Sequence, residues 1–172
     1  MIDSKEAIRI LKEEGCSTEV LNHVRAVRDV SMEIAENIEK SGVDVDKNLV
    51  EVGALLHDIG RSKTHDIKHG VEGSKILKER GLEKIVPIAE NHLGAGIAKE
   101  EAEKLDLPEK DFLPSSLEEK IVTYGDNLIV EDKRQTYEEA LEEMREELGQ
   151  NHEGVSRFKN MHDELEKLGA FN

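Results

Sequence analysis

Apolar residues recur at helical spacing along almost the whole chain. The first two helices are predicted over about 4–14, before Gly15, and from Ser17 or Thr18 to about Lys40. Asp46 is placed to cap a third helix that runs into Gly60. Further along the chain, apolar residues at the same helical spacing predict helices over about 69–80, 83–93, 115–129, 137–148 and 158–168. Because no segment alternates as a strand does, the pattern predicts an all-α, compact helical bundle of about eight helices.

Glycines, prolines and serines punctuate this pattern. The segment Lys99–Pro114 is polar and holds two prolines, so it is the segment expected to move as a flap. Ser115 and Glu118 have the spacing of a capping box at the start of the next helix. At 172 residues the chain is expected to form one domain, with a core over about 17–130 and extra C-terminal helices over about 135–168.

Composition narrows the classes of function. Aromatic residues make up 3% of the chain and Trp is absent, so the core must be mainly aliphatic. The net charge of −15 excludes broad nucleic-acid binding, because phosphate neutralisation needs a basic face. A small phosphorylated substrate stays compatible with this charge, since a bound divalent ion reverses the local sign of a site.

The sequence also carries an expectation about location. No apolar run is long enough to cross a bilayer, and the first ten residues lack the apolar stretch of a signal peptide. The single cysteine, Cys16, cannot form an internal disulfide. We therefore expect a cytoplasmic protein with no membrane partner.

Polar side chains interrupt the apolar stripes at several places. His23 lies on one helix face with Val20 and Val27, and Asp126 lies one turn after Val122. Three more histidines lie near helix ends or glycines: His57, His69 and His92. Any one alone is best explained as a hydrogen-bonded core residue, but several on separate helices favour one shared cation. Imidazoles and carboxylates without thiolates favour Mn, Fe, Co, Ni or Mg.

The stretch LLHDIGRSKTHDIKHG offers two His-Asp pairs. His57-Asp58 ends an apolar helix, where both side chains can be held rigidly inside the molecule. His65-Asp66 lies in a polar segment, where the expected structure is a solvated loop with Asp66 capping the following helix. The first pair is therefore predicted to bind the metal, and His65 stays open as a contact to substrate phosphate.

The order of these residues resembles the HD superfamily of metal-dependent phosphohydrolases. His23, His57-Asp58 and Asp126 match its H…HD…D pattern, LLHDIGR is similar to the HDIG motif, and YGDNL is similar to the final Asp motif. The resemblance covers about residues 23–126 and implies an HD-type fold. It also implies that His23, His57, Asp58 and Asp126 are ligands of one divalent ion.

Family members that bind two ions add histidines between the HD pair and the last Asp. His69 and His92 occupy such positions, and they are candidates for a second ion or for substrate phosphate. Many two-ion members have a His-His pair where this chain has Asn91-His92, so the second ion stays open.

The resemblance implies hydrolysis of a phosphate ester, of a nucleotide or a cyclic phosphate, by a metal-activated water. Asp58 and Arg61 are the catalytic candidates, with Arg61 offering a bidentate fork to phosphate. The weaker phosphate candidates are Lys63, Lys68 and Arg134. The alternative is a non-catalytic module that binds a nucleotide or a structural metal. The chain lacks the GYP motif of cyclic-di-GMP hydrolases.

Overall fold

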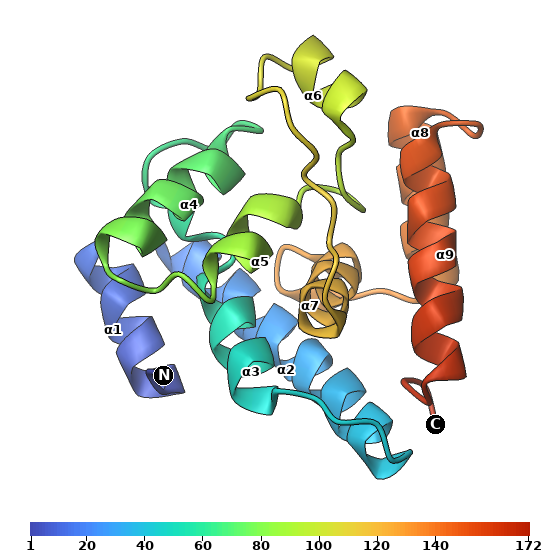
Figure 1. The fold of residues 1–172 in the computed structure, drawn as a ribbon, viewed down its shortest axis with the longest axis horizontal. Coiled ribbons are helices and arrows are strands. Elements are labelled where there is room, and N and C mark those ends of the chain that lie inside the picture. Colours follow the sequence, from blue (N-terminus) through green and yellow to red (C-terminus); the bar gives the residue numbers. More distant parts are fainter.

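The structure, a computed structural model, describes residues 1–172 and is a bundle of nine α-helices (Figure 1). The helices are α1 (Ser4–Glu13), α2 (Thr18–Lys40), α3 (Lys47–Leu56), α4 (His69–Glu79), α5 (Val86–Asn91), α6 (Lys99–Lys104), α7 (Leu117–Asn127), α8 (Tyr137–Leu148) and α9 (Glu153–Lys167). The predicted all-α class is confirmed. None of these helices is both long and apolar enough to cross a membrane.

Short polar side chains begin most of the long helices, as their hydrogen bonds show. Ser17 accepts from the amide of Val20 and Asp46 from that of Leu49, which confirms both predicted starts. The predicted capping box at Ser115 and Glu118 is wrong by one residue. The box of α7 pairs Ser116 with Glu119, while the Ser115 hydroxyl also donates to the Glu119 carboxylate.

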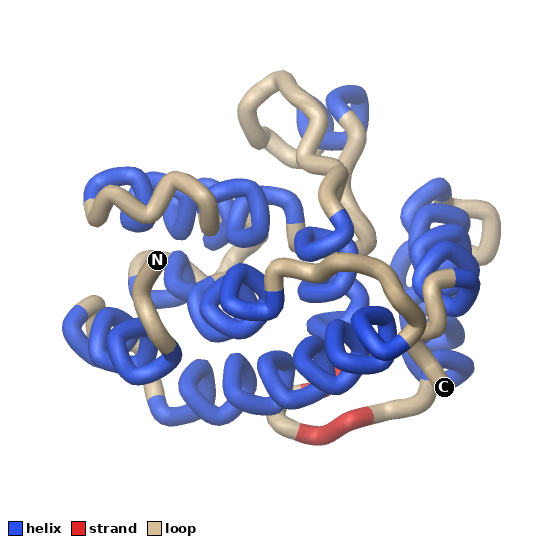
Figure 2. The backbone as a smooth tube through the Cα atoms, turned by 60° about the horizontal axis from the view of Figure 1, so that its bottom comes forward, coloured by secondary structure: helices blue, strands red, loops and turns tan.

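Two regions differ from the predicted structure. The third helix ends at Leu56 and a short 3-10 turn, Ile59–Ser62, follows it, so it does not run into Gly60. After α7 the chain forms a two-stranded antiparallel hairpin of β1 (Ile129–Val130) and β2 (Lys133–Arg134), where no strand was predicted (Figure 2). Two-residue strands are too short to show alternation, so the pattern does not reveal them.

Two aliphatic clusters fill the bundle. The larger joins α2, α3 and α7 to α8 and α9, with Val27, Ile34 and Phe158 among its buried side chains. The second joins α1, α4 and α5 to the other side of α2 and α3, around Leu11 and Leu77. In Figure 1, α7 is seen nearly end-on between α2–α3 and the α8–α9 pair. The helices that carry the candidate ligands therefore meet where the two clusters adjoin.

The segment 99–114 forms a third, smaller unit around α6, at the top of Figure 1. Ile97 and Phe112 pair through both backbone hydrogen bonds, and a small cluster that includes Leu107 is buried beside them. Surface ion pairs link this unit to the body, among them Lys110 with Glu90 at 2.8 Å. Its predicted movement as a flap stays a prediction.

Candidate metal centre

Side chains from three helices meet at one point inside the bundle. The Nε2 atoms of His23, on α2, and His57, after α3, lie 2.9 and 3.2 Å from Oδ1 of Asp126, on α7. Oδ2 of Asp58 lies 3.6 Å from Nε2 of His23 and 3.7 Å from Nε2 of His57. The four residues predicted to surround one ion are thus adjacent, although they span more than a hundred positions of the sequence.

The same aspartate faces a second pair of histidines. Oδ1 of Asp58 lies 3.2 Å from Nε2 of His69, the first residue of α4. It lies 3.2 Å from Nε2 of His92, which ends α5, and the two Nε2 atoms are 3.0 Å apart. Asp58 therefore stands between two groups of imidazoles and presents one carboxylate oxygen to each.

Backbone carbonyls fix the orientation of all four imidazoles. The Nδ1 atoms of His57, His69 and His92 lie 2.6, 2.7 and 2.8 Å from the carbonyl oxygen three residues earlier in each case. Nδ1 of His23 lies 2.6 Å from the carbonyl of Glu131, in the turn of the β1–β2 hairpin. A carbonyl only accepts, so every Nδ1 donates and every Nε2 turns toward the carboxylates. This is the tautomer that a metal-binding histidine needs.

This arrangement fits a cation. Oδ1 of Asp58 is buried and accepts no hydrogen bond, because the imidazole protons are engaged by carbonyls. Neutral imidazole nitrogens and a carboxylate oxygen repel one another at these distances unless a positive charge lies between them. Oxygen and imidazole donors without a thiolate suit a divalent ion such as Mn, Fe, Co, Ni or Mg. The donor set therefore fits the metal that the sequence implied.

Protonation partly replaces the cation when no metal is bound. Burial lowers the pKa of His57, but the charges of Asp58 and Asp126 outweigh it and raise that pKa to about 9. Burial raises the pKa of Asp58 and of Asp126, yet the adjacent imidazoles, His57 foremost, hold both pKa values well below the usual range. Burial lowers the pKa of His92. The centre thus keeps its carboxylates charged and a proton on His57.

The predicted phosphate contacts lie at different distances from this centre. Arg61 is adjacent, because its Nε donates to Oδ2 of Asp58 at 2.9 Å. The other three cations form ion pairs elsewhere: Lys63 with Glu14 at 3.7 Å, Lys68 with Asp106 at 3.0 Å and Arg134 with Glu33 at 2.9 Å. The structure therefore brings only Arg61 of these four to the candidate ligands.

The second His-Asp pair lies outside the centre, in an exposed loop. The carboxylate of Asp66 accepts from the amide of Lys68 in the turn before α4, so it does not cap that helix as predicted. Its backbone carbonyl, however, is the group that orients His69, a role that the side-chain pattern could not reveal. Asn91, which stands where many two-ion family members have a second histidine, donates to the buried carboxylate of Glu119 at 3.0 Å.

A cleft of about 520 Å³ opens in front of the centre. His23, Asp58, Arg61 and His65 line it, so both the candidate ligands and the exposed histidine reach the same space. A neighbouring cavity of about 280 Å³ lies on the other side of His23 and Arg61 and includes Asp126. The centre is therefore accessible to a small molecule.

Several known proteins are similar to this chain in sequence. An uncharacterized protein of Methanocaldococcus jannaschii is 47% identical over 168 residues, which cover 97% of this chain and 99% of the relative. The tRNA (cytidine(56)-2'-O)-methyltransferases of Picrophilus torridus and Thermoplasma volcanium are each 40% identical, over 96% and 83% of this chain. The chain spans less than half of these two enzymes, 47% and 41% of their lengths.

Solved structures share the fold. The HD domain of the phosphodiesterase PgpH of L. monocytogenes, in complex with cyclic-di-AMP, aligns with a TM-score of 0.55 over 89% of this chain and 92% of that one. The sequence identity is 20%, and the same domain without the ligand gives a TM-score of 0.54. A family model described as HD domain matches residues 20–131, which contain all the candidate ligands. The chain belongs to the HD domain family.

Proposed function

We propose that this protein is a metal-dependent phosphohydrolase that cleaves a phosphate ester of a nucleotide or of a cyclic phosphate. The observation that carries the proposal is the position of Asp58, which is buried and faces imidazole Nε2 atoms with both carboxylate oxygens. Arg61 pairs with Oδ2 of Asp58, but Oδ1 is buried between two imidazoles with no partner, which would be a costly arrangement for a merely structural site.

The residues divide into two sets of donors. His23, His57, Asp126 and Oδ2 of Asp58 would hold one ion, and their donor atoms lie within 3.7 Å of a neighbour in the set. His69, His92 and Oδ1 of Asp58 would hold a second ion. Ions held there would lower the pKa of a bound water toward about 7 and would polarise a phosphoryl oxygen.

The chain's own groups then have defined tasks in hydrolysis. The oxygen of water forms a bond to phosphorus and the water gives up a proton, while the ester P–O bond breaks and the leaving oxygen takes up a proton in its place. Arg61 lies beside Asp58 and can turn its guanidinium to the phosphoryl oxygens, where it offsets the developing charge. The carbonyls of Ala54 and Glu131 keep His57 and His23 oriented, so the donors need no rearrangement during the reaction.

A nucleotide is the substrate class that the comparisons favour. The solved HD domain with the same fold is a phosphodiesterase bound to cyclic-di-AMP, a cyclic phosphodiester. Two relatives carry a domain similar to this chain within enzymes named for tRNA methylation. The net charge of −15 disfavours direct binding of long nucleic acid by this chain, which leaves small phosphate esters as the substrates.

Hydrolysis of bis-p-nitrophenyl phosphate by metal-free protein supplied with Mn, Fe, Co, Ni or Mg tests the proposal. We expect turnover that needs the metal and that falls at least about a hundredfold in His57→Ala and Asp58→Ala. Asp66→Ala is the matched control, because it removes the aspartate of the other His-Asp pair, and it should retain activity. Metal binding without turnover of any phosphate ester would instead identify a structural metal site, and equal losses in Asp58→Ala and Asp66→Ala would contradict the assignment.

A further inference from the structure

The walls around the metal centre are acidic. The acidic residues Glu19, Glu131 and Asp132 line the cleft in front of it, and Glu143 and Glu147 line the neighbouring cavity. Arg61 is the one Lys or Arg residue in either lining. Among the ionised side chains of these linings outside the centre, a substrate therefore meets five carboxylates and one cation, Arg61.

The three cations predicted as weak phosphate contacts do not change this balance. They are paired with Glu14, Asp106 and Glu33, and they line neither space. A chain of several phosphates needs a cation for each additional charge, and like charges at close range cost several kcal/mol. The surroundings of the centre thus suit one phosphoryl group and disfavour a polyphosphate.

A second cavity of about 530 Å³ adjoins the centre on the other side of His65 and His69. It lies between the loop that contains Leu93 and Ile97, the helix α6, and the turn between α8 and α9. Leu105 and Leu148 are 42% and 43% exposed there, although both are large apolar side chains. This volume lies within the range of pockets for small organic ligands, about 300–1,000 Å³.

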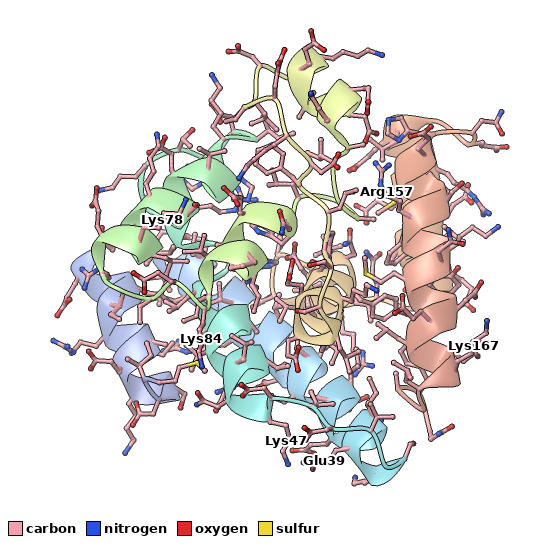
Figure 3. All side chains as sticks on the ribbon, in the orientation of Figure 1. Glu39, Lys47, Lys78, Lys84, Arg157 and Lys167 are labelled. Carbon is pink, nitrogen blue, oxygen red and sulfur yellow. The ribbon has the colours of Figure 1, made fainter.

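The charges in this second cavity nearly cancel. Asp66 and Glu101 oppose Lys104 and Arg157 in its lining. Arg157, labelled between α6 and α9 in Figure 3, donates to the carbonyl of Gly96 at 3.0 Å and to the Glu101 carboxylate at 2.6 Å. Its charge is therefore used to join α9 to α6, and the cavity presents an apolar surface with little net charge.

From these two observations we infer the kind of substrate: one phosphoryl group carried on an uncharged organic part of about nucleoside size. The phosphoryl group lies at the metal centre, and the organic part lies in the second cavity, between α6 and the α8–α9 turn. His65, which lines both spaces, marks the boundary between them. This inference rests on the proposed function for the phosphoryl group, but the apolar cavity makes its own contribution to binding.

Adenosine 5′-monophosphate and adenosine 5′-triphosphate test the charge of the substrate. With metal-loaded protein, we expect kcat/KM for the monophosphate to exceed that for the triphosphate by about tenfold or more. The double variant Glu19→Gln, Asp132→Asn should narrow the ratio about threefold, because it removes two rim charges. Glu36→Gln with Asp44→Asn makes the same change of charge at the far end of α2 and should leave the ratio as it is. Faster turnover of the triphosphate would overturn the inference.

Calorimetric binding to the metal-loaded protein tests the apolar cavity without any turnover. The double variant Leu105→Gln, Leu148→Gln should weaken binding of the monophosphate about tenfold and leave binding of inorganic phosphate unchanged. The matched double variant with Met at both positions should bind like the wild type. The inference would be overturned if the Gln variant bound both the monophosphate and inorganic phosphate more weakly to the same degree, or bound both as the wild type does. Absence of hydrolysis with these binding results intact would contradict only the proposed function.

Discussion

Asp58 is the residue that both halves of the candidate metal centre share. Its side chain is 3% exposed, and its two oxygens face different pairs of imidazoles. A buried carboxylate needs positive charge close to it, and only a proton or a metal ion can supply that charge here besides Arg61. Protons and metal ions therefore compete for the same nitrogens, above all for Nε2 of His57.

Metal affinity should consequently rise with pH. The pKa of His57 is raised to about 9 from 6.5, so a metal ion must displace its proton throughout that window. We expect the apparent Kd for Mn to fall about tenfold per pH unit between about pH 6.5 and 9, with release of one proton. Calorimetry in buffers of different ionisation enthalpy measures both quantities. A Kd independent of pH in this window would contradict the protonation of His57.

The stability of the metal-free protein should fall as the pH rises above about 6.5, whereas metal affinity rises with pH. Because folding raises the pKa of His57, its protonation stabilises the folded state. This contribution is fully present below about pH 6.5 and is lost as the pH rises toward 9. The lowered pKa values of Asp58 and Asp126 contribute stability above about 3.8 that is lost as the pH falls further. Urea unfolding should thus show highest stability between about pH 4 and 6.5. In His57→Gln most of the decline from 6.5 to 9 should disappear, and the smaller part that belongs to His23, whose pKa is also raised because the effect of burial is outweighed by Asp126, should remain.

At the scale of the elements, helix ends position the centre. His57 comes directly after α3, and His92 comes directly after α5. The Nδ1 atom of each therefore donates to a backbone carbonyl that the end of its own helix leaves free. The 3-10 turn after Asp58 then brings Gly60 against the start of α4, where His69 lies. A Cβ on Gly60 would lie 1.8 Å from the carbonyl oxygen of His69, so only glycine permits this approach.

Gly60→Ala should therefore damage both stability and the second half of the centre. The backbone of α4 must move, which we expect to cost about 2–3 kcal/mol and to weaken metal binding through His69. Gly53→Ala is the control: its Cβ would meet the flexible end of Ile88, on α5, and the change should stay within about 1 kcal/mol. Urea unfolding and metal titration measure the two effects. Unchanged metal binding in Gly60→Ala would show that this contact does not position His69.

The sequence predicts the elements that carry the candidate ligands where the apolar pattern extends over several helical turns. It fails where contacts between elements determine the structure. Helical spacing predicted the helices that carry His23 and Asp126, and a motif identified His57-Asp58. The hairpin that orients His23 was missed, because its strands have two residues each and the orienting group is a backbone carbonyl. The family pattern marked His69 and His92 as candidates, but it could not show that both meet at Oδ1 of Asp58, since that depends on how α4 and α5 pack together.

At the scale of the whole molecule, the metal centre joins helices that otherwise meet through two separate apolar clusters. α2, α3 and α7 contribute His23, His57 and Asp126, while α4 and α5 contribute His69 and His92. An ion bound there would stabilise the packing of all five helices at once. It would also neutralise buried negative charge in a chain of net charge −15, which repels itself in the folded state.

Metal binding should therefore raise the melting temperature of the whole domain in one cooperative transition. A ligand at about 100 times its Kd adds about 2.7 kcal/mol, which corresponds to about 5–10 °C for a domain of this size. Calorimetric scans of metal-free and metal-loaded protein measure this shift. Asp58→Asn should lose most of it, because both sets of donors share that carboxylate, whereas Asp66→Asn should keep it. A shift confined to one of two separate transitions would mean that the centre stabilises only part of the bundle, and that the five helices do not depend on a common ion.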